Sequence, residues 1–221
     1  MSHRPAARPH PGGAVHFLAG LILLLGASAV PVRAAVFNDA TRDLGLSDDA
    51  RIFLNVTNDY FAPPPAVAVE LLRNSPVPED DFPVILYLAR ASKRPPQEIL
   101  RQRADYPSWS DIMDRSNISP SVLFAGIDRD PGPPYGKAWG YWRKHPRDER
   151  TRFRDRDVVE LVKLQVASRS QRVSPYAVAS VRQKEITVEQ YVAEKKRGKY
   201  PTAKGGSRGK GKGHSKPHGH D

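Results

Sequence analysis

The sequence predicts an all-α fold in which one helix-turn-helix-turn-short-helix unit occurs twice within a single domain, followed by a disordered basic tail. Apolar residues recur at helical spacing through the central part of the chain, whereas strand patterns are sparse. A pattern of prolines, helix caps and apolar positions repeats at an offset of 79 residues. Residues 198–221 hold too few hydrophobic side chains to offset the entropy of ordering, which predicts the disordered tail.

The first 34 residues have the three zones of a secretory signal. Residues 1–13 are basic and contain no acid, residues 14–30 are almost entirely apolar, and Val32-Arg33-Ala34 closes the segment with small residues at the spacing that signal peptidase reads. We predict cleavage after Ala34 and export to a bacterial periplasm or beyond. The alternative is an uncleaved anchor, although the apolar run of 17 residues is short of the roughly 20 that a spanning helix needs. No transmembrane segment is expected after cleavage.

The net charge of +11 comes from the two ends of the chain. Of 35 basic and 24 acidic residues, three basic residues lie in 1–34, and nine basic residues and one acidic residue lie in 195–221. That leaves 23 residues of each sign in 35–194, so this part is formally neutral. Binding to genomic DNA needs a positive face that contacts phosphates, and we expect no such partner.

Residues 35–79 are expected to form a helical lead-in. Ser47 is an N-cap residue before a helix over 47–58, because serine accepts a hydrogen bond from a backbone N–H in the first turn. Pro63-Pro64-Pro65 ends this helix, and 66–73 is a further short helix.

Residues 80–197 contain the duplicated units, at 80–115 and 157–194. Pro96 and Pro175 occupy the same place in the two units, with matching apolar positions before and after them. The repetition predicts an internal duplication, with the two units packed on each other.

Capping signals mark the helices of both units. Each proline stands in a first helical turn, where its missing N–H costs nothing, and Ser174 is a natural N-cap before the second one. Thr187-x-x-Gln190 matches a capping box, and Ser108-x-x-Asp111 comes close to one. Helices this regular are expected to be scaffold.

Residues 128–156, here called the aromatic segment, are expected to form a long loop between the units. Long loops in small domains usually carry function or are disordered, and large rings interleaved with cations favour function here. The rings either present a ligand surface, stacking on sugars while cations pair with anions, or fill the space between the two units. The candidate ligand-binding residues are Tyr135, Lys137, Trp139, Tyr141, Trp142 and Arg143.

The stretch GPPYGKAWGYW at 132–142, placed between two helical units, resembles a segment of an uncharacterised family of exported bacterial proteins. The resemblance extends over roughly residues 80–194. It implies export and supplies no activity, cofactor or site residue.

Motifs for catalysis are absent from the sequence. There is no cysteine, no G-x-S-x-G, no glycine-rich phosphate loop and no H-E-x-x-H, and His145 is the single histidine of residues 35–194. A hydrolase using Asp128, Asp130 or His145 is a remote alternative, and no cofactor is expected.

The leading functional hypothesis is therefore a non-enzymatic exported binding or structural protein, with a cell-envelope glycan or another polyanion as the partner that its location suggests. The second hypothesis is an envelope or polyanion binder acting through the tail, which has lysines and arginines at short intervals. His214, His218 and His220 of the tail are weak candidates for binding a transition metal ion.

Overall fold

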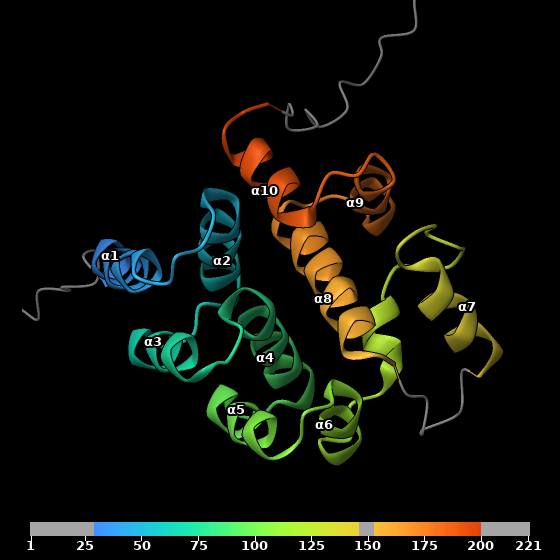
Figure 1. The fold of residues 1–221 in the computed structure, drawn as a ribbon, viewed down its shortest axis with the longest axis horizontal. Helices are drawn as coiled ribbons and strands as arrows, with labels where there is room; N and C mark the ends of the chain where they lie inside the picture. The colour runs from blue at the N-terminus through green and yellow to red at the C-terminus, as the bar shows by residue number, and fades with distance from the viewer. Residues whose placement is uncertain (1–28, 146–152, 200–221) are drawn as a thin grey trace, which may run out of the picture.

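A computed structural model describes residues 29–145 and 153–199 of the chain, and the side chains from residue 34 onward in the first helix. Over these residues the protein is all-α, as the sequence predicts, with ten α-helices, one 3-10 helix and no strand. Figure 1 shows α1 and α7 at opposite ends of the molecule, with α4 and α8 side by side between them. The helices are α1 (Ala29–Arg42), α2 (Asp48–Phe61), α3 (Pro65–Asn74), α4 (Pro78–Ser92), α5 (Pro96–Asp105), α6 (Trp109–Arg115), η1 (Pro120–Phe124), α7 (Gly136–Lys144), α8 (Asp155–Ser170), α9 (Pro175–Arg182) and α10 (Val188–Lys196).

The lead-in contains the two expected helices and one that was not expected. Ser47 caps α2, with its hydroxyl accepting a hydrogen bond from the Ala50 N–H at 3.2 Å. The following prolines separate α2 from α3. The unexpected helix is α1, which runs through the predicted cleavage junction at Ala34 and buries Phe37 against Phe82 of α4 at a ring distance of 5.2 Å.

Both predicted units have the expected order of long helix, middle helix and short helix, as α4-α5-α6 and α8-α9-α10. Thr187 forms a complete capping box with Gln190, and Ser108 accepts a hydrogen bond from the Asp111 N–H. Figure 1 shows α4 and α8, the long helix of each unit, packed together. A common origin of the units stays a prediction, because similar order and capping do not require it.

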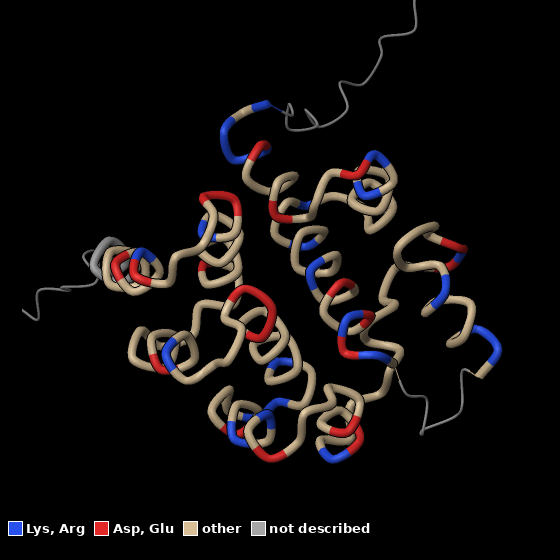
Figure 2. Tube along the Cα trace, in the orientation of Figure 1, with Lys and Arg blue, Asp and Glu red and all other residues tan. Residues whose placement is uncertain are grey.

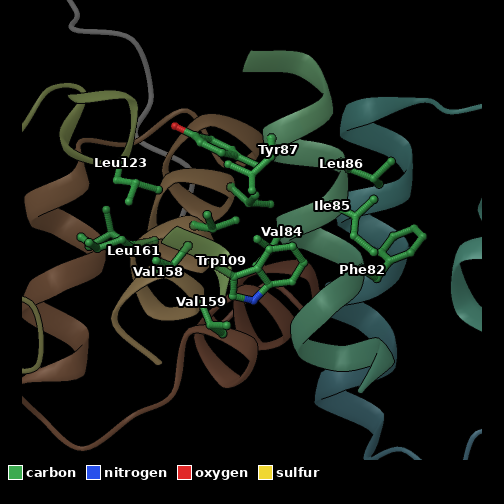
Figure 3. Packing of buried hydrophobic residues seen from close by; sticks show 14 of the residues in the cluster. Phe82, Val84, Ile85, Leu86, Tyr87, Trp109, Leu123, Val158, Val159 and Leu161 are labelled. Carbon is green, nitrogen blue, oxygen red and sulfur yellow. The ribbon is translucent and has the colours of Figure 1, made fainter. Parts of the chain in front are cut away.

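The core lies around α4 and α8. Their middle turns are buried on all sides, which explains why both helices are apolar around most of their circumference. Trp109 of α6 is fully buried among the α4 and α8 side chains (Figure 3). Burying these residues is the main source of stability in a domain that has no disulfide.

The aromatic segment is not one long loop, because α7 occupies Gly136–Lys144. The three glycines and four prolines of the segment suppress the sequence signal for a helix. The helix forms because Ala138 and Trp142, four residues apart, pack on the same side against the core. Tertiary packing has overridden local propensity here. Within the described ranges, no helix has the length and apolar character needed to cross a membrane.

Candidate ligand-binding cleft

The six candidate residues of the aromatic segment divide between packing and exposure. Tyr135, at the N-terminal boundary of α7, is only 1% exposed. Trp142 is half-buried and stacks on Phe124 of η1, with ring centroids 4.7 Å apart. Trp139 is also half-buried against the core. These three rings therefore attach α7 to the rest of the protein.

The other three candidates face outward. Tyr141 is 43% exposed and touches Phe153 edge-on at 6.2 Å. Lys137 and Arg143 are exposed, and the Arg143 guanidinium lies 5.6 Å from the centre of the Trp139 ring. Lys137 and Tyr141, four residues apart, thus share one side of α7, whereas Arg143 lies on the opposite flank beside Trp139.

A cleft of about 590 Å³ opens where α7 and α8 begin. This volume suits a small polar molecule. Gly132 in the wall has a φ of +75°, which strains any larger residue, and a Cβ there would also displace the Gln183 amide, whose Nε2 would stand 2.6 Å away. The cleft is lined by Asp130, Gly132, Pro133, Pro134, Tyr135, Gly136, Lys137, Ala138, Arg154, Arg156, Asp157, Glu160 and Leu161.

Every acid in this cleft has a partner within the protein. Asp130 accepts a hydrogen bond from the Gly132 N–H at 2.8 Å. Asp157 forms two hydrogen bonds of 2.9 Å with Arg154. Glu160 lies 3.6 Å from Nε of Arg182.

Two cations of the cleft have no such partner. Neither Lys137 nor Arg156 forms an ion pair or a side-chain hydrogen bond with any residue that the structure describes. Each stands in the first turn of its helix, α7 or α8, where the helix dipole disfavours positive charge. Lys137 and Arg156 therefore lack ion-pair partners in the cleft, and the Asp130 carboxylate, bonded to a neutral N–H, keeps its negative charge beside them.

The Tyr135 hydroxyl oxygen is buried and makes no hydrogen bond of normal geometry within the described residues, although the Arg182 guanidinium lies close enough to interact with it. Burial raises the pKa of this phenol, Glu160 raises it further and Arg182 acts against the rise, so the group keeps its proton at physiological pH. Tyr135 lines the cleft, but its hydroxyl oxygen is sealed from solvent.

The carboxylates and the histidine suggested for hydrolysis do not form a catalytic group. Asp128 accepts a hydrogen bond from the Tyr176 hydroxyl at 2.6 Å, and this bond lowers the pKa of Asp128. Asp130 lies where α7 begins. His145 follows the last residue of α7, roughly 13 Å along the helix at 1.5 Å per residue. Asp130 and His145 therefore cannot act on one bond together.

Two clusters of buried ionic groups lie outside the cleft. Lys163 of α8 contacts Asp80 at 2.5 Å and Glu189 at 2.7 Å, joining α8 to α4 and α10. Arg103 of α5 contacts Asp81 at 3.3 Å and Asp155 at 2.9 Å. Each ion pair joins two different helices and therefore stabilises their packing.

Sequence reasoning found Tyr135 and Lys137 but missed the opposite wall of the cleft. Arg154, Arg156 and Glu160 belong to the start of α8, about twenty residues further along the chain. The available signal was a pair of arginines at a helix N-terminus, against the preference of the dipole. The histidines proposed for metal binding in the tail lie outside the described residues, within which no three His, Cys, Asp or Glu side chains gather in a metal-binding arrangement.

Comparison of the chain with protein-family models, curated proteins and solved structures finds no match.

Proposed function

We propose that this chain is a non-enzymatic exported protein that binds an acidic glycan of the bacterial envelope through α7. The observation that carries the proposal is the division of roles within this helix. Tyr135 and Trp142 anchor it, while Tyr141, Lys137 and Arg143 remain exposed. Flat rings stack on sugar rings, and cations pair with carboxylates.

Charge distribution supports a local site over a general polyanion surface. Figure 2 shows acidic and basic residues interleaved over the described helices, in keeping with the formal neutrality of residues 35–194. A mixed surface gives little nonspecific attraction to polyanions. Lys137 is the cation that shares a side of α7 with the exposed Tyr141 ring, and Arg143 offers a second positive charge on the other flank.

Sedimentation with purified acidic cell-wall glycan tests the proposal. We expect Tyr141→Ala and Arg143→Gln each to lower the affinity at least fivefold without changing the melting temperature by more than a few degrees, because both side chains are exposed. Arg73→Gln on α3 is the control with the same loss of charge, placed on another exposed helix. Unchanged binding by the two α7 variants would refute the proposal.

The second candidate is polyanion binding by the tail. The observation that favours it is that nine basic residues and one acidic residue lie in 195–221, whereas residues 35–194 are neutral. Such binding depends steeply on salt, because it releases counterions. Polyanion binding by the tail would be unchanged by the α7 substitutions and would be lost when residues 200–221 are deleted.

A further inference from the structure

The bond at which we predict signal cleavage lies inside a folded helix. Ala34 is the sixth of the 14 residues of α1, so the bond between Ala34 and Ala35 has helix on both sides of it. Ala34 is half-buried, and it stands three residues before Phe37 and seven before Thr41, both of which are buried. Side chains at this spacing share one face of a helix, so the residue that precedes the cleaved bond is turned toward the body of the protein.

We infer that α1 protects this bond once the protein has folded, so that cleavage has to come before α1 packs against the rest of the chain. The inference goes beyond glycan binding by α7, and it rests on the export signal that the sequence predicts. It gives the contact between Phe37 and Phe82 the role of closing the cleavage site.

Cleavage requires peptide groups that the helix keeps occupied. A peptidase binds the residues on both sides of the cleaved bond in extended form, because its own groups must reach peptide N–H and C=O groups that a helix pairs internally. In an α-helix the carbonyl of residue i accepts a hydrogen bond from the N–H of residue i+4. Extending residues 32–36 therefore breaks hydrogen bonds that reach as far as Ala40. The cleavable form is one in which most of α1 has unwound.

Side chains of α1 oppose this unwinding. Phe37 is 2% exposed, and its ring centre lies 5.2 Å from that of Phe82, which is fully buried in α4. Thr41 is buried too, and its hydroxyl donates to the Asn38 carbonyl at 2.9 Å. Further contacts join α1 to α2 and α3. Unwinding through Ala40 withdraws Phe37 from the core, and the cost of exposing this ring keeps the cleavable form rare in the folded protein.

Cleavage before folding leaves the same contacts available. The shortened chain begins at Ala35, and the part of α1 that remains still contains Phe37 and Thr41. A processed chain can therefore pack α1 through both residues. A chain that folds first keeps the apolar residues 14–30, and with them an affinity for membranes. The order of the two events then decides whether the protein is released or held at a membrane.

Order-of-addition cleavage of the full chain tests the inference. In one order, the chain is diluted from urea into detergent micelles that already contain a bacterial signal peptidase. In the other, it first folds in the micelles and then receives the peptidase. We expect cleavage after Ala34 in the first order and cleavage about tenfold slower in the second, measured by intact mass. Equal rates in the two orders, or no cleavage after Ala34 in either, would overturn the inference.

Phe82→Ala loosens α1 without changing any residue next to the cleaved bond. It should speed cleavage of the folded chain about tenfold and leave cleavage of the unfolded chain unchanged. Phe82→Leu keeps an apolar side chain at this place, and it should give a smaller increase in a protein that still folds. No increase with either variant would contradict the role of the contact between Phe37 and Phe82.

Ile112→Ala is the control for general loss of stability. Ile112 is fully buried in α6, whereas α1 packs against α2 and α3. Ile112→Ala should speed cleavage of the folded chain much less than Phe82→Ala does. Equal acceleration would show that only global unfolding exposes the bond, and it would overturn local protection by α1. Glycan sedimentation tests the proposed function separately, because α1 and α7 lie at opposite ends of the molecule (Figure 1).

Discussion

Trp142 and Tyr141 are neighbours in the sequence, yet they have different surroundings on α7. Trp142 stacks on Phe124, whereas Tyr141 is 43% exposed. We expect Trp142→Ala to reduce the free energy of unfolding by about 2–3 kcal/mol, less than for a fully buried tryptophan. Tyr141→Ala should cost less than about 1.5 kcal/mol. Urea denaturation of the two variants measures both free energies of unfolding. Equal losses of free energy would show that Trp142 and Tyr141 contribute equally to stability.

Lys163 is the most consequential buried charge, because it is 7% exposed and contacts carboxylates from two other helices. Lys163→Met should destabilise the protein by roughly 3–5 kcal/mol, since it leaves Glu189 and Asp80 without their cation. The double variant Lys163→Met/Glu189→Gln should recover part of that loss. Chemical denaturation of the four proteins in this cycle measures the coupling, and a double variant no better than the single one would contradict it.

The same cluster predicts how stability depends on pH. Burial acts to raise the pKa of Glu189, but Lys163 outweighs it and holds the pKa below the ordinary 4.5. The stabilisation by Glu189 is therefore present above pH 4.5 and is lost as the pH falls through the lower folded value. Burial would lower the pKa of Lys163, yet Glu189 and Asp80 raise it above 10.5, so its stabilisation is lost only as the pH rises beyond that value.

Denaturation of the wild type and of Glu189→Gln between pH 3 and 7 tests the acid side. The wild type should lose more stability than the variant on acidification below about 4.5. Asp81 works in the opposite direction, because burial raises its pKa against the effect of Arg103 and protonation therefore favours its folded form. Glu70→Gln on the exposed side of α3 is the control, and it should follow the wild type. If the stability of the wild type and of Glu189→Gln changed with pH in parallel, Glu189 would not contribute to the loss of stability in acid.

At the scale of the helices, Ser108 and Thr187 cap the short third helix of each unit. Ser108→Ala and Thr187→Ala should each cost about 1 kcal/mol, the usual value of an N-cap hydrogen bond. Similar losses are expected if the two units use this position in the same way. Urea midpoints measure the losses, and Ser180→Ala on the exposed face of α9, which removes no cap, is the control.

A second correspondence between the units involves arginines. Arg103 of α5 donates to the carbonyl of Pro107, and Arg182 of α9 donates to the carbonyl of Ile186 at 3.2 Å. Both arginines also meet an acid on the long helix of their own unit. The offset of 79 residues aligns these arginines in the sequence, so the alignment predicts a shared bond as well as a shared helix order.

The helices with strong caps and apolar periodicity could be predicted from the sequence, and those formed by tertiary contacts could not. Ser47, Ser174 and Thr187 each start a helix where the local pattern indicates one. For α7 the local signal is poor, because Gly136 and Gly140 lower helix propensity and the stabilising stack with Phe124 is invisible in sequence.

The cleft was only half predictable for a similar reason. Tyr135 and Lys137 belong to a segment whose composition is conspicuous. Arg156 closes the same segment but belongs to α8, and only folding brings it opposite α7 in the cleft. Composition can identify one wall of a site, whereas the opposite wall depends on how distant helices pack.

At the scale of the whole molecule, the chain between 145 and 153 joins two parts that already hold each other. Ser110 of α6 exchanges hydrogen bonds of 3.0 and 2.8 Å with the backbone of Phe153, and the Trp109 N–H donates to Asp155 at 2.8 Å. Further contacts join α4 to α8 and α2 to α10. Continuity of the chain is therefore not what keeps the two parts together.

The two parts of the chain should therefore reassemble when they are produced as separate fragments. Fragments ending at His145 and starting at Phe153, produced separately, should each fail to form a cooperative fold, because α4 and α8 would expose the faces that they bury on each other. Mixed, they should reassociate into one helical species with a single thermal transition, observable by circular dichroism and size-exclusion chromatography. Substituting Ser110 by Ala should weaken the reassociation, while Ser180→Ala should not. If the second fragment folded alone, the two halves would be independent modules. Folding would then not depend on their association, and mixing the fragments would produce no new transition.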